Sequence, residues 1–509
     1  MTAVIPSPPV GTRSSVGLRS ERGPVLGAIM LTTALVALDS TIIATAVPSI
    51  VRDLGGFSQF PWLFSIYLLT QAVTVPIYGK LADAVGRRPV MLFGIAVFLL
   101  GSVLCGFAWS MPALIAARAV QGVGAGAVQP MGITIIGDLY SVEERSRVQG
   151  YVASVWGAAS VVGPAIGGLF SDFLSWRWIF FINLPLGLLA ALVLRRRFTE
   201  GVVRRRHTID YAGAGLLTVG CSLLILGLLE GGTAWAWGSV TSGAVLGGAA
   251  LALVAFVPVE RRAAEPVLPL WVFRHRVLIG GNLTAVAVGA LLIGLSSYVP
   301  TYVQGVLGTG AVEAGFALAA LTIGWPIAAA LSGRLYMRIG FRDTALAGVA
   351  VVIVGSVLTA DLGPHSPVWQ VAAAMFVTGT GLGLCSSPTL VAVQSVVGWE
   401  RRGVVTGTNM FSRSMGSALG AAALGALANA TLTDRLAHAP AALAGTLPKG
   451  ADAASTSFQH RAGPTGDVVR AALYDASHQV FLALLVTAVL VVGALLLMPR
   501  RTEQLVVED

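Results

Sequence analysis

Two charged residues lie inside long apolar stretches of this chain. Asp39 belongs to the segment LDSTIIATAVP, and Arg118 belongs to the segment RAVQGVGAG. A charged side chain within a membrane is costly, so it normally pairs with another group or faces a water-filled cavity, and a carboxyl there can exchange a proton. Asp39 is therefore a candidate proton carrier and Arg118 its candidate partner. The alternative for each is a purely structural hydrogen bond to a neighbouring helix or its carbonyls.

The expected depths of these two residues allow them to meet. Arg118 lies six residues from the expected outer end of its helix, and Asp39 lies nine residues from the outer end of its own. At about 1.5 Å per residue their depths differ by about 5 Å, which long side chains can bridge. We expect Arg118 to favour the charged form of Asp39 when the two are close, and Asp39 to take up a proton when the helices separate.

A third deep charge is Arg413, ten residues into the expected thirteenth helix. It could face a central cavity, balance Asp39, or bind carbonyls of a kinked helix. Polar and aromatic side chains near mid-span could line the same cavity, although for most of them an interhelical hydrogen bond or an interface anchor is the simpler interpretation. These further candidates are Tyr67, Gln71, Gln129, Trp156, Asn282, Tyr298, Gln304 and Asn409.

The composition indicates an integral membrane protein. Of 509 residues, 55% are hydrophobic and 11% are charged, whereas soluble domains have about 25% charged residues. The net charge of +9 does not indicate nucleic-acid binding, because the arginines lie in short turns between apolar runs. Cys105, Cys221 and Cys385 lie in separate apolar segments, which argues against disulfides and against a metal site.

Fourteen stretches reach the length of about 20 apolar residues that a membrane helix needs. With the N-terminus in the cytoplasm, only six of the 33 Lys and Arg residues lie in outward loops, as the positive-inside rule requires. Both termini are then cytoplasmic, and the richness in Arg and Ala favours a bacterial inner membrane. The expected spans are 25–48, 61–79, 90–108, 112–137, 149–171, 177–194, 210–230, 240–259, 277–300, 313–333, 344–361, 368–390, 403–430 and 479–498.

An internal repeat divides the chain into two halves. The loop GKLADAVGRRP at 79–89 returns in altered form as GRLYMRIGFR at 333–342, and each copy follows the second helix of its half. Parallel six-helix repeats place such copies on the same membrane face. The expected organisation is a cytoplasmic tail 1–24, an N-terminal bundle 25–195, a linker 196–276 with two extra membrane helices, a C-terminal bundle 277–498 with a long outward loop at 431–478, and a cytoplasmic tail 499–509.

Within the first copy of this loop, Gly79 and Gly86 permit a close helix approach and a sharp turn. Asp83 and Arg87 are spaced i,i+4, and Arg87 with Arg88 indicates the cytoplasmic face. The fifth expected span contains GAASVVGPAIGG, in which the proline frees a carbonyl and bends the helix while the glycines allow close packing. The residues of interest in that span are Gly157, Gly163, Pro164, Gly167 and Gly168.

The loop pattern G-x-L-x-D-x-x-G-R-R resembles the signature loop of the major facilitator superfamily, whose members are membrane transporters. The first-span, R-x-x-Q-G and fifth-span patterns resemble those of its fourteen-helix drug:proton antiporter branch (EmrB/QacA-type). The resemblance implies an all-α polytopic membrane protein with two six-helix bundles plus two extra transmembrane helices, 14 in total. It also implies that Asp138 contacts Arg87 and, with Asp83, forms a cytoplasmic cluster holding the outward-facing state.

These features predict a proton-coupled exporter of small amphiphilic molecules, such as drugs or antibiotics, that works by alternating access. We expect no enzyme activity, no cofactor, no metal, no nucleic-acid partner, and a monomer in the lipid bilayer driven by the proton gradient. The alternatives are an exporter of a lipid or metabolite on the same fold, and a membrane transceptor or scaffold. Because further buried acids are scarce, neutral, zwitterionic or weakly anionic cargo is expected at least as readily as quaternary cations.

Overall fold

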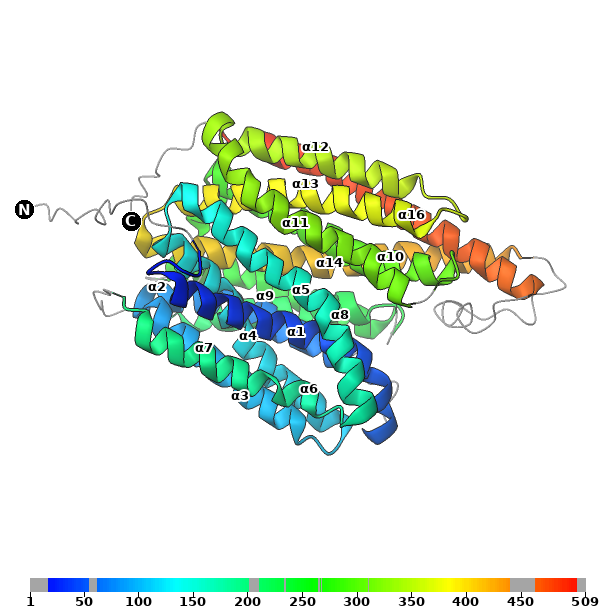
Figure 1. Cartoon of the computed structure of the whole chain (residues 1–509), viewed down its shortest axis with the longest axis horizontal. Helices are drawn as coiled ribbons and strands as arrows, with labels where there is room; N and C mark the ends of the chain where they lie inside the picture. The colour runs from blue at the N-terminus through cyan, green and yellow to red at the C-terminus, as the bar shows by residue number, and fades with distance from the viewer. Residues whose placement is uncertain are drawn as a thin grey trace, which may run out of the picture.

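The computed structural model describes residues 17–54, 62–200, 210–232, 235–263, 266, 268–309, 311–439 and 463–500. The secondary-structure elements of this part of the chain are helices (Figure 1). Twelve of the described helices are long and apolar enough to cross a membrane, and a thirteenth apolar stretch, Ala212–Leu228, is shorter. The protein is therefore an all-helical membrane protein that crosses the bilayer many times.

The N-terminal half is built from helices that pack in the order expected for one six-helix bundle, with α3 on α4, α1 on α5 and α2 on α4. The core of this half lies where α1 to α5 and α7 meet. Its helices are α1 (Gly23–Leu54), α2 (Trp62–Val85), α3 (Arg87–Gly106), α4 (Met111–Leu139), α5 (Val142–Phe173), α6 (Trp178–Phe181) and α7 (Asn183–Arg197).

The sixth expected span, 177–194, is not one continuous helix. It is divided into α6 and α7, with Ile182 between them. Pro185 has no amide hydrogen to donate to the carbonyl four residues earlier, at Phe181, so the helical ladder is interrupted there. The interruption places Asn183 at the first position of α7.

The two helices between the halves, α8 (Tyr211–Glu230) and α9 (Val240–Arg262), pack on each other. Of the two, α8 contacts α2 of the N-terminal half and α14 (Arg402–Ala437) of the C-terminal half. A cluster of buried apolar residues from these elements, including Leu69, Cys221 and Ala418, fills the junction. The extra pair therefore lies across one edge of the boundary between the halves.

The C-terminal half repeats the packing of the first, with α11 on α13, α12 on α13 and α10 on α14. Short 3-10 turns precede α10 and α14. Besides α14, its helices are α10 (Arg276–Gly305), α11 (Ala311–Ile339), α12 (Phe341–Ala360), α13 (Val368–Ser395) and α16 (Pro464–Leu496).

The loop expected at 431–478 is much shorter in the structure. The preceding helix α14 continues to Ala437, and α16 begins at Pro464, so both ends of the expected loop are helical. A helix of 33 to 36 residues is longer than a bilayer is thick, so α14 and α16 extend beyond the membrane. The polar residues at the end of α14 and the start of α16 are therefore helical and do not form a loop. Residues 440–462 lie outside the described part of the chain.

The two copies of the repeated turn adopt the same backbone conformation. Gly86 precedes α3 with φ 103° and ψ 157°, and Gly340 precedes α12 with φ 89° and ψ 166°. This region of backbone space is essentially restricted to glycine. The internal repeat seen in the sequence therefore corresponds to a repeated turn.

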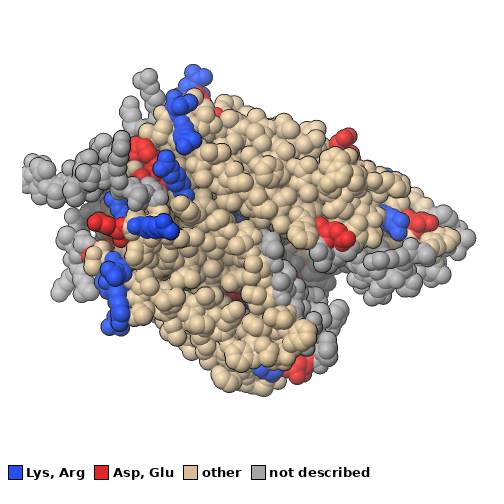
Figure 2. All heavy atoms as spheres, in the orientation of Figure 1, with Lys and Arg blue, Asp and Glu red and all other residues tan. Residues whose placement is uncertain are grey.

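Basic side chains gather at one end of the molecule, the left end in Figure 2. The last turn of α7 contributes Arg195, Arg196 and Arg197, and that of α9 contributes Arg261 and Arg262. We call this the basic end; α1 begins there and α16 ends there (Figure 1). At the opposite end, basic residues are paired with acids, as in Arg177–Asp53 at 2.7 Å and Arg435–Asp475 at 2.9 Å.

The conformation of Gly86 leads to a stability prediction. Replacing it with alanine forces a side chain into a region that only glycine adopts readily, so Gly86→Ala should destabilise the protein by about 1–3 kcal/mol. Thermal unfolding of the purified protein in detergent measures this as a lower transition temperature. The matched control is Gly215→Ala in α8, where an added Cβ meets no atom within 4 Å. Equal transition temperatures for both variants would contradict the argument.

Candidate functional site

Asp39 and Arg118 form a direct ion pair deep in the N-terminal half. Arg118 Nη1 lies 2.6 Å from Asp39 Oδ2, and the two side chains are 1% and 2% exposed. The depth difference of about 5 Å expected from the sequence is bridged without water. The guanidinium also donates through Nε to the carbonyl of Leu63 in α2, at 3.1 Å, so the pair joins α1, α2 and α4.

Two side chains that sequence reasoning did not assign complete the surroundings of Asp39. Gln121 Nε2 donates to Asp39 Oδ1 at 2.7 Å, and Asn183 Nδ2 donates to the same oxygen at 3.3 Å. Both amides also donate to Ser102 Oγ in α3, at 2.9 and 3.2 Å. Gln121 lies one helical turn after Arg118, so the sequence indicates that both lie on the same face of α4. Asn183 belongs to α7, and the sequence does not indicate that α7 packs close to Asp39.

Tyr67 belongs to this pair instead of lining open space. It is 2% exposed, and its ring lies 4.1 Å from the Arg118 guanidinium carbon in a cation–π arrangement. With Tyr67, the charged pair is enclosed by α1, α2, α3, α4 and α7, all of one half. The arrangement supplies three hydrogen-bond donors to the Asp39 carboxylate, from Arg118, Gln121 and Asn183.

A second charge cluster lies at the basic end and centres on Arg87, whose side chain is fully buried. Its guanidinium lies 2.8 Å from Asp83, 3.1 Å from Asp138 and 3.8 Å from Glu200. It also donates to the carbonyl of Trp399 at 2.6 Å and stacks on that ring at 3.8 Å. Because Trp399 precedes α14, Arg87 links the two halves.

Asp83 strengthens this link by binding the start of α14. Its two oxygens accept the amides of Gly403 at 3.0 Å and Val404 at 2.8 Å. A carboxylate is stabilised there by the free amides and the positive end of the helix dipole. A Cβ on Gly79 would lie 2.8 Å from the Gly403 carbonyl, so the glycine of the signature loop is required for this close crossing.

Two other residues predicted at this end, Asp138 and Arg88, differ in which half of the protein they contact. Asp138 binds Arg402 of α14 at 3.1 Å, so it bridges the halves together with Arg87. Arg88 binds the carbonyl of Arg195 in α7 and stays within its own half. Glu200, which sequence analysis missed, accepts the amides of Arg87 at 2.9 Å and Arg88 at 3.1 Å and so caps α3.

The fifth-span glycines face two different neighbours. A Cβ on Gly163 would lie 2.1 Å from Thr41 Oγ1 of α1, next to Asp39, and one on Gly157 would lie 3.0 Å from the carbonyl of Thr322 in α11. Gly167 is buried, and Gly168 and the proline at position 164 lie within α5. The motif therefore permits α5 to pack on both halves.

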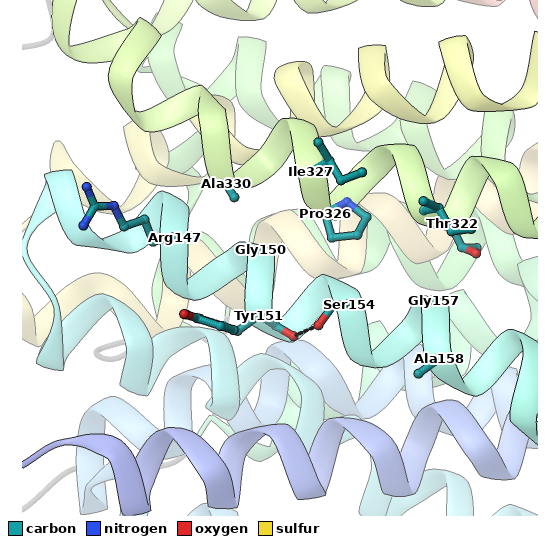
Figure 3. Close-up of a pocket in the computed structure, with 11 residues that line it drawn as sticks. Arg147, Gly150, Tyr151, Ser154, Gly157, Ala158, Thr322, Pro326, Ile327 and Ala330 are labelled. Atoms are coloured by element: carbon teal, nitrogen blue, oxygen red, sulfur yellow. Dashed lines mark hydrogen bonds between the residues drawn. The ribbon is translucent and has the colours of Figure 1, made fainter. Parts of the chain in front are cut away.

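A groove of about 680 Å³ opens between α5 and α11 (Figure 3). Arg147 lies at one end and Thr322 at the other (Figure 3), and Tyr151 and Ser154 of α5 and Pro326 and Ile327 of α11 are among the lining residues. Because its walls come from opposite halves, its width depends on how the halves are placed.

Several of the other cavity candidates form pairs between helices. Gln71 donates to Gln129 at 3.4 Å, and Asn409 donates to Asn282 at 3.3 Å. The hydroxyl of Tyr298 donates to the carbonyl of Leu424 at 3.3 Å. Trp156 packs against the core of the N-terminal half, and Gln304 is half-buried in α10. Arg413, half-buried in α14, is considered separately below.

The extra helices contain a buried pair of acids that sequence analysis also missed. Glu260 is 3% exposed and accepts the amide of Leu268 at 2.6 Å, while Asp210 accepts the amide of Gly213 at 2.8 Å as the N-cap of α8. The other carboxylate oxygens, Glu260 Oε2 and Asp210 Oδ2, both lie beside Gly213. Both oxygens are buried, and no donor to them lies among the described residues. Asp210 precedes α8, and Glu260 lies in the last turn of α9.

The bridge at the basic end leads to a conformational prediction. Asp83→Asn removes a charged acceptor from both Arg87 and the start of α14, so the basic end should open in a larger fraction of molecules. Spin labels placed on α2 and α14 near this end would report longer distances by pulsed electron paramagnetic resonance. The control is Asp53→Asn, which breaks an ion pair inside one half at the opposite end. An unchanged distance distribution in Asp83→Asn would refute the bridging role.

Comparison with known proteins agrees with this architecture. Residues 29–421 match the Major Facilitator Superfamily. The chain is 37% identical over 431 residues to the multidrug transporter protein MdtP of Bacillus subtilis, covering 83% of this chain and 79% of that protein. It is 35% identical to multidrug resistance protein 3 of the same organism, covering 85% and 84%, and 31% identical to the efflux pump dotC of Dothistroma septosporum, covering 76% and 68%.

A solved structure shares the fold. The human organic anion transporter MFSD10 superposes with a TM-score of 0.60 at 15% identity, over 92% of this chain and 99% of that one. At this identity the likeness concerns the fold alone. The two bundles, the repeated turn and the Arg87 cluster agree with the family match and with the bacterial and fungal efflux relatives. The chain belongs to the major facilitator superfamily.

Proposed function

We propose that this protein is a proton-coupled antiporter that exports small amphiphilic molecules by alternating access. The observation that carries the proposal is the buried Asp39–Arg118 pair, held by amides from α4 and α7 within a half that is bridged to its partner half at one end. An acid so deep in the membrane is expensive and is expected to have a function. Relatives of this chain that are named as multidrug transporters and efflux pumps support the export of drug-like cargo.

In the proposed cycle, the paired state holds Asp39 charged, with Arg118 and two amides as donors. Movement of α1 against α4 separates Asp39 from Arg118, and the freed carboxylate takes up a proton. Thr41 offers a route for coupling, since it donates to the carbonyl of Ala159 in α5, two residues after Gly157, the first glycine of the motif. The helix α5 also packs on α11, so motion at Asp39 and motion between the halves are connected.

The proposal includes fourteen membrane spans with the basic end in the cytoplasm, because basic residues are enriched on that side of membrane proteins. The Arg87 and Asp83 bridge then closes the cytoplasmic side, which corresponds to an outward-facing conformation. The ion pairs of this bridge are buried, so the cost of desolvating their charges offsets much of their attraction, and the bridge can bias two states but cannot drive the cycle. The membrane potential supplies the work, at about 2.3 kcal/mol per charge per 100 mV.

A second candidate is the export of a lipid-like molecule. The groove between α5 and α11 favours it, because the Arg147 guanidinium lies at one end and alanine, proline and isoleucine side chains line much of the remaining wall. An amphiphile with one polar end would match this distribution.

The proton-coupling role is tested with reconstituted protein. Proteoliposomes with an imposed pH gradient should accumulate dye or antibiotic with the native protein, and Asp39→Asn should abolish this gradient-driven accumulation while binding in detergent persists. The control is Asp361→Asn, an exposed acid that follows α12. Gradient-driven accumulation by Asp39→Asn at the native level would disprove the proton-carrier role. If fluorescent phospholipid is moved while dyes are not, the second candidate is supported.

A further inference from the structure

Arg413 is a deep charge without a charged partner. It lies 11 residues after Arg402, the first residue of α14, which places it about 16 Å along the helix. Its side chain is half-buried, and no acid among the described residues forms an ion pair with its guanidinium. Arg118, by contrast, is balanced by Asp39 at 2.6 Å.

The side chain starts from the face of α14 that packs on α10. One turn before it, Asn409 donates to the carbonyl of Gly281 in α10 at 3.1 Å; one turn after it, Ser417 donates to the carbonyl of Gly289 at 3.2 Å. A Cβ on Gly289 would lie 2.1 Å from the Arg413 carbonyl, so the two backbones touch. Helical side chains lean toward the helix N-terminus, so we expect Arg413 on the side of the Asn409 turn.

This turn is rich in donors and poor in acceptors. Among the described residues no acceptor bonds the buried Asn282 Nδ2, while Asn282 Oδ1 is already used by Asn409. A guanidinium brings five further N–H donors and no acceptor. A buried donor without an acceptor is costly. A bound group that brings acceptors and negative charge would remove these costs.

We infer that Arg413, together with Asn282 and Asn409, forms the subsite that binds the acidic group of the cargo. The cargo class is then amphiphilic organic anions that carry a carboxylate or a sulfonate. A guanidinium binds such planar or trigonal anions through two parallel hydrogen bonds, which gives both strength and orientation. The inference rests on the proposed export function and names its substrate class.

The test is equilibrium dye binding to the full-length protein in detergent, without any gradient. The probes are two xanthene dyes of similar shape, anionic sulforhodamine B and cationic rhodamine 6G, followed by fluorescence anisotropy. Arg413→Gln should weaken sulforhodamine B binding at least tenfold and leave rhodamine 6G binding unchanged or tighter. Arg413→Lys should restore most of the anion affinity, because it restores the charge. The matched control is Arg338→Gln, which removes an exposed arginine of α11.

A second variant keeps the test decisive if Arg413→Gln does not fold, as judged by gel filtration and thermal unfolding. Asn282→Asp replaces an unused donor with a negative acceptor, so it should weaken sulforhodamine B and strengthen rhodamine 6G. Equal sulforhodamine B affinity in native and folded variant protein overturns the inference. So does native protein that binds only rhodamine 6G, or neither dye.

Failure of the proposed function gives a different result. If proton coupling is wrong, Asp39→Asn retains gradient-driven transport, but sulforhodamine B binding still depends on Arg413. If the subsite is wrong, Asp39→Asn abolishes transport while Arg413→Gln leaves the anion affinity unchanged.

Discussion

The cost of burying charge in an apolar interior determines how this molecule is built. Asp39 and Arg118 are tolerated because they neutralise one another at 2.6 Å and because Gln121 satisfies the remaining carboxylate oxygen. Removing one partner from such a pair leaves an uncompensated charge, which is far more costly than the pair itself is favourable. The surrounding helices must therefore remain in register around the pair.

The two charge clusters differ in what they connect. The Asp39 network joins five helices of one half, so it makes that half a unit that can move as a body. The Arg87 cluster joins the halves, and its partners at the start of α14 are backbone amides and a carbonyl that water can replace. Only the first copy of the repeated loop has these charges, because Met337 and Phe341 occupy the positions of Asp83 and Arg87 in the second copy.

Glycine has a different role at each boundary. Gly86 and Gly340 are required by backbone conformation, whereas Gly79 and Gly403 are required because α2 and α14 nearly touch. Gly163 accommodates Thr41 beside the buried acid, and Gly157 lies against α11. Glycine therefore allows close helix packing at the charged pair, at the groove between α5 and α11, and at the bridge at the basic end.

The sequence alone predicted the helical membrane class, the repeated turn and the residues of the charged pair, because hydropathy, glycine spacing and the rarity of buried charge are local properties. It misjudged the ends of α14 and α16, since a helix that leaves the membrane keeps its hydrogen bonds and gives no apolar signal. Tertiary structure decided that Asn183 reaches Asp39 across a helix break and that Glu200 caps α3. It also decided that Asn282 of α10 contacts Asn409, which lies one turn before Arg413 in α14. These arrangements depend on how helices distant in sequence approach one another, and no local pattern specifies that approach.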